Sequence, residues 1–132
     1  MSPGPGGRSS ARILLVSDDP TVADSCARAL RLDGYEVWAA LSADDGLRLA
    51  HTHAPHAVVL DVRTPLARAL GVARALRELP RLAATSIAIV SGDLHPTADA
   101  LVELSALGAQ VRYKPLWLDE LVALARSLVS AA

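Results

Sequence analysis

Two stretches decide the fold: residues 11–20 read ARILLVSDDP, and residues 57–65 read AVVLDVRTP. Each contains a short apolar run, then an acidic residue, and then a proline. Such a run is typical of a strand that is buried on both faces, as strands of parallel sheets are. Residues 86–91, SIAIVS, form a third run of this kind. The three runs predict the centre of a parallel sheet.

Two further runs mix polar with apolar residues, as edge strands can: Tyr35–Ala40 (YEVWAA) and Gln110–Lys114 (QVRYK). Helical patterns fill the gaps between the five runs. Five strands alternating with five helices predict an α/β fold with a five-stranded parallel sheet and helices on both faces. Edge positions for the second and fifth strands favour the order 2-1-3-4-5 of flavodoxin-like, doubly wound (βα)5 domains.

The helices are predicted from apolar stripes and from residues typical of helix ends. The first helix is expected to end near Gly34 and the second to start at a capping box of Ser42 and Asp45. A third precedes Pro80, and a fourth runs from Thr97 to Gly108. The predicted apolar stripes are Val22, Cys26, Ala29 and Leu30; Ala43, Leu47, Ala50 and Ala54; Ala69, Ala73 and Leu76; and Leu118, Leu121, Ala125 and Leu128.

The composition excludes several classes of protein. Residues 1–10, MSPGPGGRSS, are predicted to be a flexible leader, and residues 11–132 a single domain. A net charge of −1 with scattered arginines argues against direct nucleic-acid binding. One cysteine, Cys26, permits neither an intrachain disulfide nor a cysteine-based zinc site, and it is expected in the core. Without an apolar run of about 20 residues no membrane span is expected, so the protein is predicted to be cytoplasmic.

Polar residues lie at the carboxyl ends of the predicted strands, where open α/β sheets bind their ligands. They are Asp18 and Asp19 after the first strand, Asp61 in the third, Ser91 in the fourth, and Lys114 in the fifth. Clustered carboxylates require a cation, and Mg²⁺ suits one or two carboxylates with a phosphate group. A carboxylate can also be the nucleophile toward a phosphoryl group. Lys114 is the chain's single lysine beside twelve arginines.

The motifs ILLVSDDP, VVLDVRTP, IAIVSGD and YKP, in this order, resemble the CheY-like receiver domain of two-component response regulators. The resemblance covers about residues 11–132. It implies that Asp61 accepts a phosphoryl group from a sensor histidine kinase or a phosphotransfer protein. It also implies that Ser91 and Lys114 contact that group, and that the domain is no enzyme beyond its own phosphorylation and dephosphorylation.

The same resemblance implies a magnesium site and an output surface. Asp18, Asp61 and the backbone carbonyl of Arg63 would bind Mg²⁺, with Asp19 as a further candidate ligand. The fourth helix, fifth strand and fifth helix would then bind a downstream protein or a second copy of the chain. We further hypothesise that Arg63 pairs with Asp93 and slows loss of the phosphoryl group.

Departures from the family pattern keep an alternative open. Ser17 stands where the family has its first acid, Val111 replaces the aromatic switch residue, and the loop after Pro65 reads LARA, residues 66–69, in place of Gly-x-Asp-Gly. These changes favour a pseudo-receiver that binds proteins without phosphorylation. A flavodoxin-like electron carrier is disfavoured, because its first loop must cradle phosphate and residues 17–20, SDDP, are acidic. An aspartyl-phosphate phosphatase would need Asp-x-Asp, whereas the chain has Asp61-Val62-Arg63.

The tract HTHAPH, residues 51–56, is interpreted as solvent-exposed histidines near a helix end. Histidines two residues apart do not share a helical face, so a metal site is disfavoured.

Overall fold

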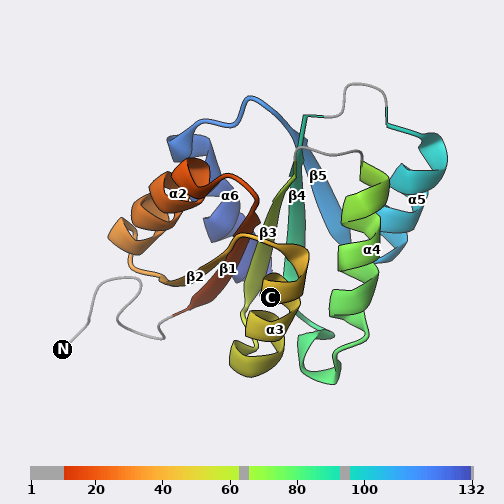
Figure 1. The fold of residues 1–132 in the computed structure, drawn as a ribbon, viewed down its shortest axis with the longest axis horizontal. Helices are drawn as coiled ribbons and strands as arrows, with labels where there is room; N and C mark the ends of the chain where they lie inside the picture. The colour runs from red at the N-terminus through yellow and green to blue at the C-terminus, as the bar shows by residue number, and fades with distance from the viewer. Residues whose placement is uncertain (1–10, 63–65, 93–95, 132) are drawn as a thin grey trace.

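The computed structural model describes residues 11–62, 66–92 and 96–131. Within them a parallel sheet has the order β2-β1-β3-β4-β5, so the predicted fold class is confirmed. The sheet is central in Figure 1. Its strands are β1 (Arg12–Ser17), β2 (Glu36–Ala40), β3 (Ala57–Val62), β4 (Ser86–Ser91) and β5 (Ala109–Tyr113).

Helices cover both faces of the sheet (Figure 1). They are α2 (Pro20–Leu32), α3 (Ala43–His53), α4 (Leu66–Arg77), the short 3-10 helix η1 (Pro80–Leu82), α5 (Ala98–Ala106) and α6 (Leu118–Ala131). Helices α2 and α6 pack on one face, and α3, α4 and α5 on the other. Among the described helices, none has the length and apolar character that crossing a membrane requires.

The strand β1 shows how alternation divides the core. Ile13 and Leu15 pack toward α2 and α6, whereas Leu14 and Val16 pack toward α3 and α4. All four are at most 7% exposed. Because successive side chains of a strand point to opposite faces, a continuously apolar run is needed where both faces are covered.

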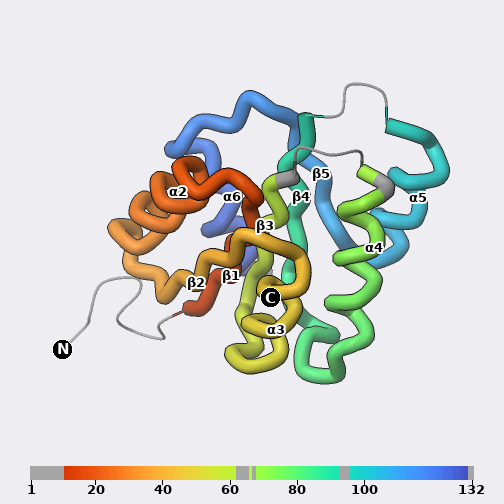
Figure 2. Tube along the Cα trace, viewed as in Figure 1, coloured from red at the N-terminus to blue at the C-terminus, as the bar shows by residue number. Residues whose placement is uncertain are grey.

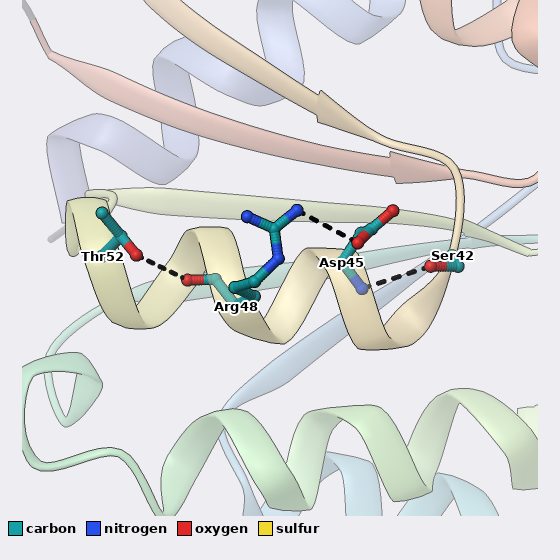
Figure 3. Close-up of polar contacts among 4 residues, drawn as sticks. All are labelled: Ser42, Asp45, Arg48 and Thr52. Carbon is teal, nitrogen blue, oxygen red and sulfur yellow. Dashed lines mark hydrogen bonds and ion pairs between the residues drawn. The ribbon is translucent and has the colours of Figure 1, made fainter.

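Local hydrogen bonds cap and stabilise the helix α3 (Figure 3). Ser42 Oγ accepts a hydrogen bond from the backbone N–H of Asp45 at 3.2 Å, which satisfies one otherwise unpaired donor of the first turn. The Asp45 carboxylate pairs with Arg48 Nη2 at 3.1 Å, and Thr52 Oγ1 donates to the Arg48 carbonyl. The predicted N-cap at Ser42 is therefore confirmed.

Several details differ from the sequence predictions. The buried face of α2 consists of Ala23, Ala27 and Leu30, and Cys26 is half-buried beside it instead of lying in the core. Of the predicted stripe only Leu30 is fully buried, and Val22, Cys26 and Ala29 are partly buried at its margin. In α4, by contrast, the predicted stripe of Ala69, Ala73 and Leu76 is buried.

Two histidines of the 51–56 tract have structural contacts, so the prediction that all three are simply solvent-exposed was wrong. His53 is half-buried and stacks on Trp38 with ring centroids 4.1 Å apart. His56 Nδ1 accepts a hydrogen bond from the backbone N–H of Arg12 at 2.9 Å. Only His51 is exposed. Both contacts join segments distant in the sequence, which helical spacing alone does not predict.

Candidate functional site

The register of the sheet gathers the sequence-predicted residues at one edge. Ser17 pairs with Asp61, Val62 pairs with Ser91, and Ser91 pairs with Tyr113, which precedes Lys114. The Cα trace in Figure 2 shows the carboxyl ends of β1, β3 and β4 side by side. Residues separated by almost a hundred positions in the chain therefore meet at one edge, as the strand order predicts.

Asp61 and Lys114 form the centre of the site. Lys114 Nζ lies 2.6 Å from Asp61 Oδ1, and the two side chains are 34% and 13% exposed. The Lys114 backbone N–H donates to the Ser91 carbonyl at 2.9 Å, so strand pairing holds the lysine at this edge. Asp61 Oδ1 is inaccessible to solvent, and no donor among the described residues makes a well-aligned hydrogen bond to it. The ammonium group, 2.6 Å away, is therefore the charge partner of this buried oxygen.

Ser17 at the end of β1, and Asp18 and Asp19 in the loop after it, have different surroundings. Ser17 is 1% exposed, and its Oγ accepts a hydrogen bond from the Asp19 N–H at 3.3 Å. Asp19 Oδ1 caps α2 by accepting from the N–H groups of Thr21 and Val22. Asp18 is exposed and borders the same cavity as Asp61. Of the two loop acids, Asp19 thus has a structural task as the N-cap of α2.

Ser91 is fully buried at the end of β4. Its Cα is paired with Val62 on one side and Tyr113 on the other, between the strands that carry Asp61 and Lys114. Arg63 and Asp93 lie outside the described residues. The Arg63 carbonyl as a magnesium ligand and the pair of Arg63 with Asp93 therefore remain predictions.

Two cavities adjoin Asp61 and differ in character. One, of about 290 Å³, lies between the end of β1, the start of α3 and α4, and is bordered by Asp18, Asp61, Ser42 and Arg68. The other, of about 540 Å³, lies beneath α2 and α6; its walls are mainly apolar, and Asp61 and Lys114 stand at its polar end. Sequence reasoning treated Arg68 as part of a changed loop and therefore missed its proximity to the two carboxylates.

The larger cavity also changes the environment of Cys26. Burial raises the pKa of the Cys26 thiol, and the nearby negative charge of Asp61 raises it further, while Lys114 acts in the opposite direction. The thiol is therefore kept protonated at neutral pH, and a nucleophilic role for Cys26 is disfavoured.

The carboxylates of Asp18 and Asp61 fit a magnesium ion by their chemistry. Both are hard oxygen donors that border one cavity. Mg²⁺ commonly uses only one or two protein carboxylates and keeps several waters. Within the described part of the chain, no group of three or more His, Cys, Asp and Glu side chains gathers as a metal site.

The strand order and the acidic edge with its paired lysine define a receiver-like α/β domain. The chain belongs to the response regulator receiver domain family, whose model matches residues 13–126. Members of this family are phosphorylated on aspartate, generally bind Mg²⁺ at that site, interact with histidine kinases, and are generally not enzymes.

Named relatives agree with this assignment. The chain is 33% identical over 123 residues to the transcriptional regulatory protein PrrA of Mycobacterium tuberculosis, covering 93% of this chain and 52% of PrrA. It is 36% identical over 124 residues to the response regulator MprA of Mycobacterium ulcerans, covering 91% of this chain and 50% of MprA. The chain thus spans about half the length of the curated relatives it matches.

Solved structures support the same fold. The chemotaxis protein CheY4 of Vibrio cholerae superposes with a TM-score of 0.78 at 21% identity, over 91% of this chain and 99% of that structure. A CheY-like receiver domain protein from Methanospirillum hungatei superposes with a TM-score of 0.80 at 24% identity, over 92% and 95% of the two chains.

Proposed function

We propose that Asp61 is the phosphoacceptor of this receiver domain and that a sensor histidine kinase or a phosphotransfer protein supplies the phosphoryl group. The observation that carries the proposal is the half-buried pair of Asp61 with Lys114, at the edge of the sheet where strand ends converge. An Asp61 oxygen attacks phosphorus, the new O–P bond forms as the donor's P–N bond breaks, and the leaving imidazole keeps the bond's electron pair.

Lys114 has two successive partners in this proposal. Before transfer its ammonium group neutralises Asp61; afterwards it can turn to an oxygen of the phosphoryl group. A compact, flexible ammonium suits this change better than a planar guanidinium does. The buried Ser91 hydroxyl is the candidate donor to a second phosphoryl oxygen.

A magnesium ion, when bound, would neutralise charge on the transferring phosphoryl group. Asp18 and Asp61 would hold it, with the Arg63 carbonyl as the further ligand implied by the family. Asp19 is the weaker candidate, because its Oδ1 already caps α2.

The output surface is proposed to be α5, β5 and α6, where it would bind a downstream protein or a second copy of the chain. Large apolar side chains are exposed there: Val102 is 68% exposed, Tyr113 46% and Trp117 66%. We propose that the domain acts in the cytoplasm and does not itself contact nucleic acid, consistent with its net charge of −1.

The test is incubation with Mg²⁺ and acetyl phosphate, followed by intact-protein mass spectrometry. A phosphate-sized mass gain that disappears in Asp61→Asn is expected. No gain in the native chain would refute the proposal and favour the pseudo-receiver, which the replacement of an acid by the buried Ser17 also favours.

A second variant separates acceptance of the phosphoryl group from the response to it. Lys114→Arg should keep the fold and the mass gain, because charge neutralisation survives. It should lose the spectral changes that phosphorylation causes in Tyr113 and Trp117, since the guanidinium group cannot follow the phosphoryl group in the same way. An unaltered response in Lys114→Arg would contradict this role.

A further inference from the structure

The apolar cavity beneath α2 and α6 has the dimensions of a ligand site. Its volume of about 540 Å³ falls within the range of roughly 300–1,000 Å³ typical of small-molecule pockets. Leu15, Val59 and Val90 from the sheet form its floor, and Leu121 of α6 closes one side. Trp117, which is 66% exposed, lies at its border.

The lining of the cavity is mainly apolar. The chain contains no phenylalanine, and Cys26 lines the cavity from α2 while Leu116 lines it from the segment after β5. Burial keeps the Cys26 thiol uncharged at neutral pH, because the pKa of this group is raised. The walls away from Asp61 and Lys114 therefore carry no charge.

The polar end of the cavity restricts the head group of a ligand. A charged head group there is attracted by one member of the 2.6 Å pair of Asp61 and Lys114 and repelled by the other, so the pair does not compensate for the hydration that the charge loses in a mainly apolar cavity. A neutral hydroxyl or amide meets no such opposition. It can accept a hydrogen bond from the Lys114 ammonium, which is the more exposed member of the pair, without separating it from Asp61.

We propose that this cavity binds a small, neutral, mainly apolar molecule with a hydroxyl or amide at one end. The bound molecule covers Asp61 and accepts a hydrogen bond from Lys114. Binding itself is independent of phosphorylation. The consequence that ligand and phosphoryl donor compete for Asp61 rests on the proposed function.

The first experiment compares three probes of nearly equal size and different charge: benzyl alcohol, benzoate and benzylamine. Each is titrated into the 132-residue chain while amide chemical shifts and tryptophan fluorescence are recorded. For so small a probe we expect a Kd of about 1 mM for the alcohol. We also expect saturable shifts at Leu15, Cys26 and Trp117. The two charged probes should bind about tenfold more weakly, because the cavity does not replace the hydration of a charged group.

Filling the cavity supplies the matched control. Cys26→Phe places a ring inside it, whereas Ser25→Phe adds the same ring on the exposed side of α2. Benzyl alcohol binding should be lost in Cys26→Phe and retained in Ser25→Phe. If Cys26→Phe loses its dispersed amide spectrum, Val22→Phe fills the same cavity from the first turn of the helix. Absence of saturable shifts, or equal binding in a folded filled variant, would overturn the site; equal affinity of all three probes would overturn the head-group assignment.

The competition is measured separately. At five times its Kd, benzyl alcohol occupies about five-sixths of the chain, so phosphorylation of Asp61 by acetyl phosphate should slow about sixfold. An unchanged rate with saturable shifts would reject the competition and leave the binding site standing. Absence of phosphorylation without any probe would instead reject the proposed function.

Discussion

Two glycines test how closely α3 is packed against the strand that leads to the site. Gly46, in the first turns of α3, is buried, and a Cβ atom added there would lie 2.7 Å from Cγ2 of Val16. Gly71, within α4, is exposed, and a Cβ atom added there would meet nothing within 4 Å. The same substitution, glycine to alanine in a helix, should therefore change stability in opposite directions.

The expected magnitudes follow from two opposing effects. Alanine is favoured over glycine inside a helix by about 0.8–1.0 kcal/mol. Gly71→Ala has only this effect, so it should stabilise the fold by roughly 0.5–1 kcal/mol. Gly46→Ala also forces apart a contact in the core, which costs about 1–3 kcal/mol. Val16 cannot relieve it easily, because it is 7% exposed and its branched side chain has few rotamers. We expect a net loss of about 1 kcal/mol for Gly46→Ala.

Urea unfolding, followed by far-UV circular dichroism, measures the free energy of unfolding of each variant. Equal m-values for the two variants would indicate that both unfold in a two-state manner. The two variants should differ by about 2 kcal/mol. Val16 also borders the cavity that Asp18 and Asp61 share, so Gly46→Ala should shift the amide signal of Asp18. If Gly46→Ala proved as stable as Gly71→Ala, the close packing of α3 on β1 would be refuted.

Three further predictions concern charged groups. Burial, and secondarily the charge of Arg12, lowers the pKa of His56. The neutral imidazole should therefore contribute its full share of the free energy of unfolding above about pH 6.5 and lose it as the pH falls. In urea unfolding, His56→Ala should reduce this dependence of the free energy of unfolding on pH. Arg77 donates to three backbone carbonyls at 2.6–2.9 Å, so Arg77→Ala should lower the free energy of unfolding by about 2–4 kcal/mol. Arg74 belongs to an exposed ion pair, so Arg74→Ala should lower it by less than about 1 kcal/mol. Equal losses in the two variants would contradict this prediction. Arg68 adds positive charge to the cavity that Asp18 and Asp61 border, so Arg68→Ser should raise the Mg²⁺ affinity several-fold in a fluorescence titration. An unchanged Kd would exclude this effect of Arg68.

The strand pattern sufficed to predict the fold because burial on both faces leaves a direct mark on a sequence. Leu14 and Leu15 are adjacent in β1, pack on opposite faces, and are each 1% exposed. Only a strand covered on both sides requires two such neighbours. Once the order of five parallel strands was inferred, the convergence of Asp61 and Lys114 followed from topology without knowledge of any side-chain contact.

The cavities could not be predicted in the same way, because each depends on the summed volumes of side chains from several elements. Cys26 lies four residues before Leu30, and this helical spacing predicted a position in the core. Periodicity does not reveal whether α6 and the sheet lie close enough to Cys26 to pack against it. Arg68 illustrates the same limit for charge. Its place relative to Asp18 depends on the rotation of α4, which has a buried face fixed by Ala69 and Ala73.

Asp61 lies between an acidic cavity and an apolar one, and in both places its carboxylate is paired with Lys114, the chain's single lysine. Asp61 is only 13% exposed, so water screens its pair with Lys114 less than it would screen a pair on the open surface. Whatever enters the acidic cavity must compete with that ammonium group for Asp61. Whatever enters the apolar cavity must tolerate both charges. If both proposed occupants bind, they meet the same ion pair, so binding in one cavity is expected to change the affinity of the other without movement of the sheet.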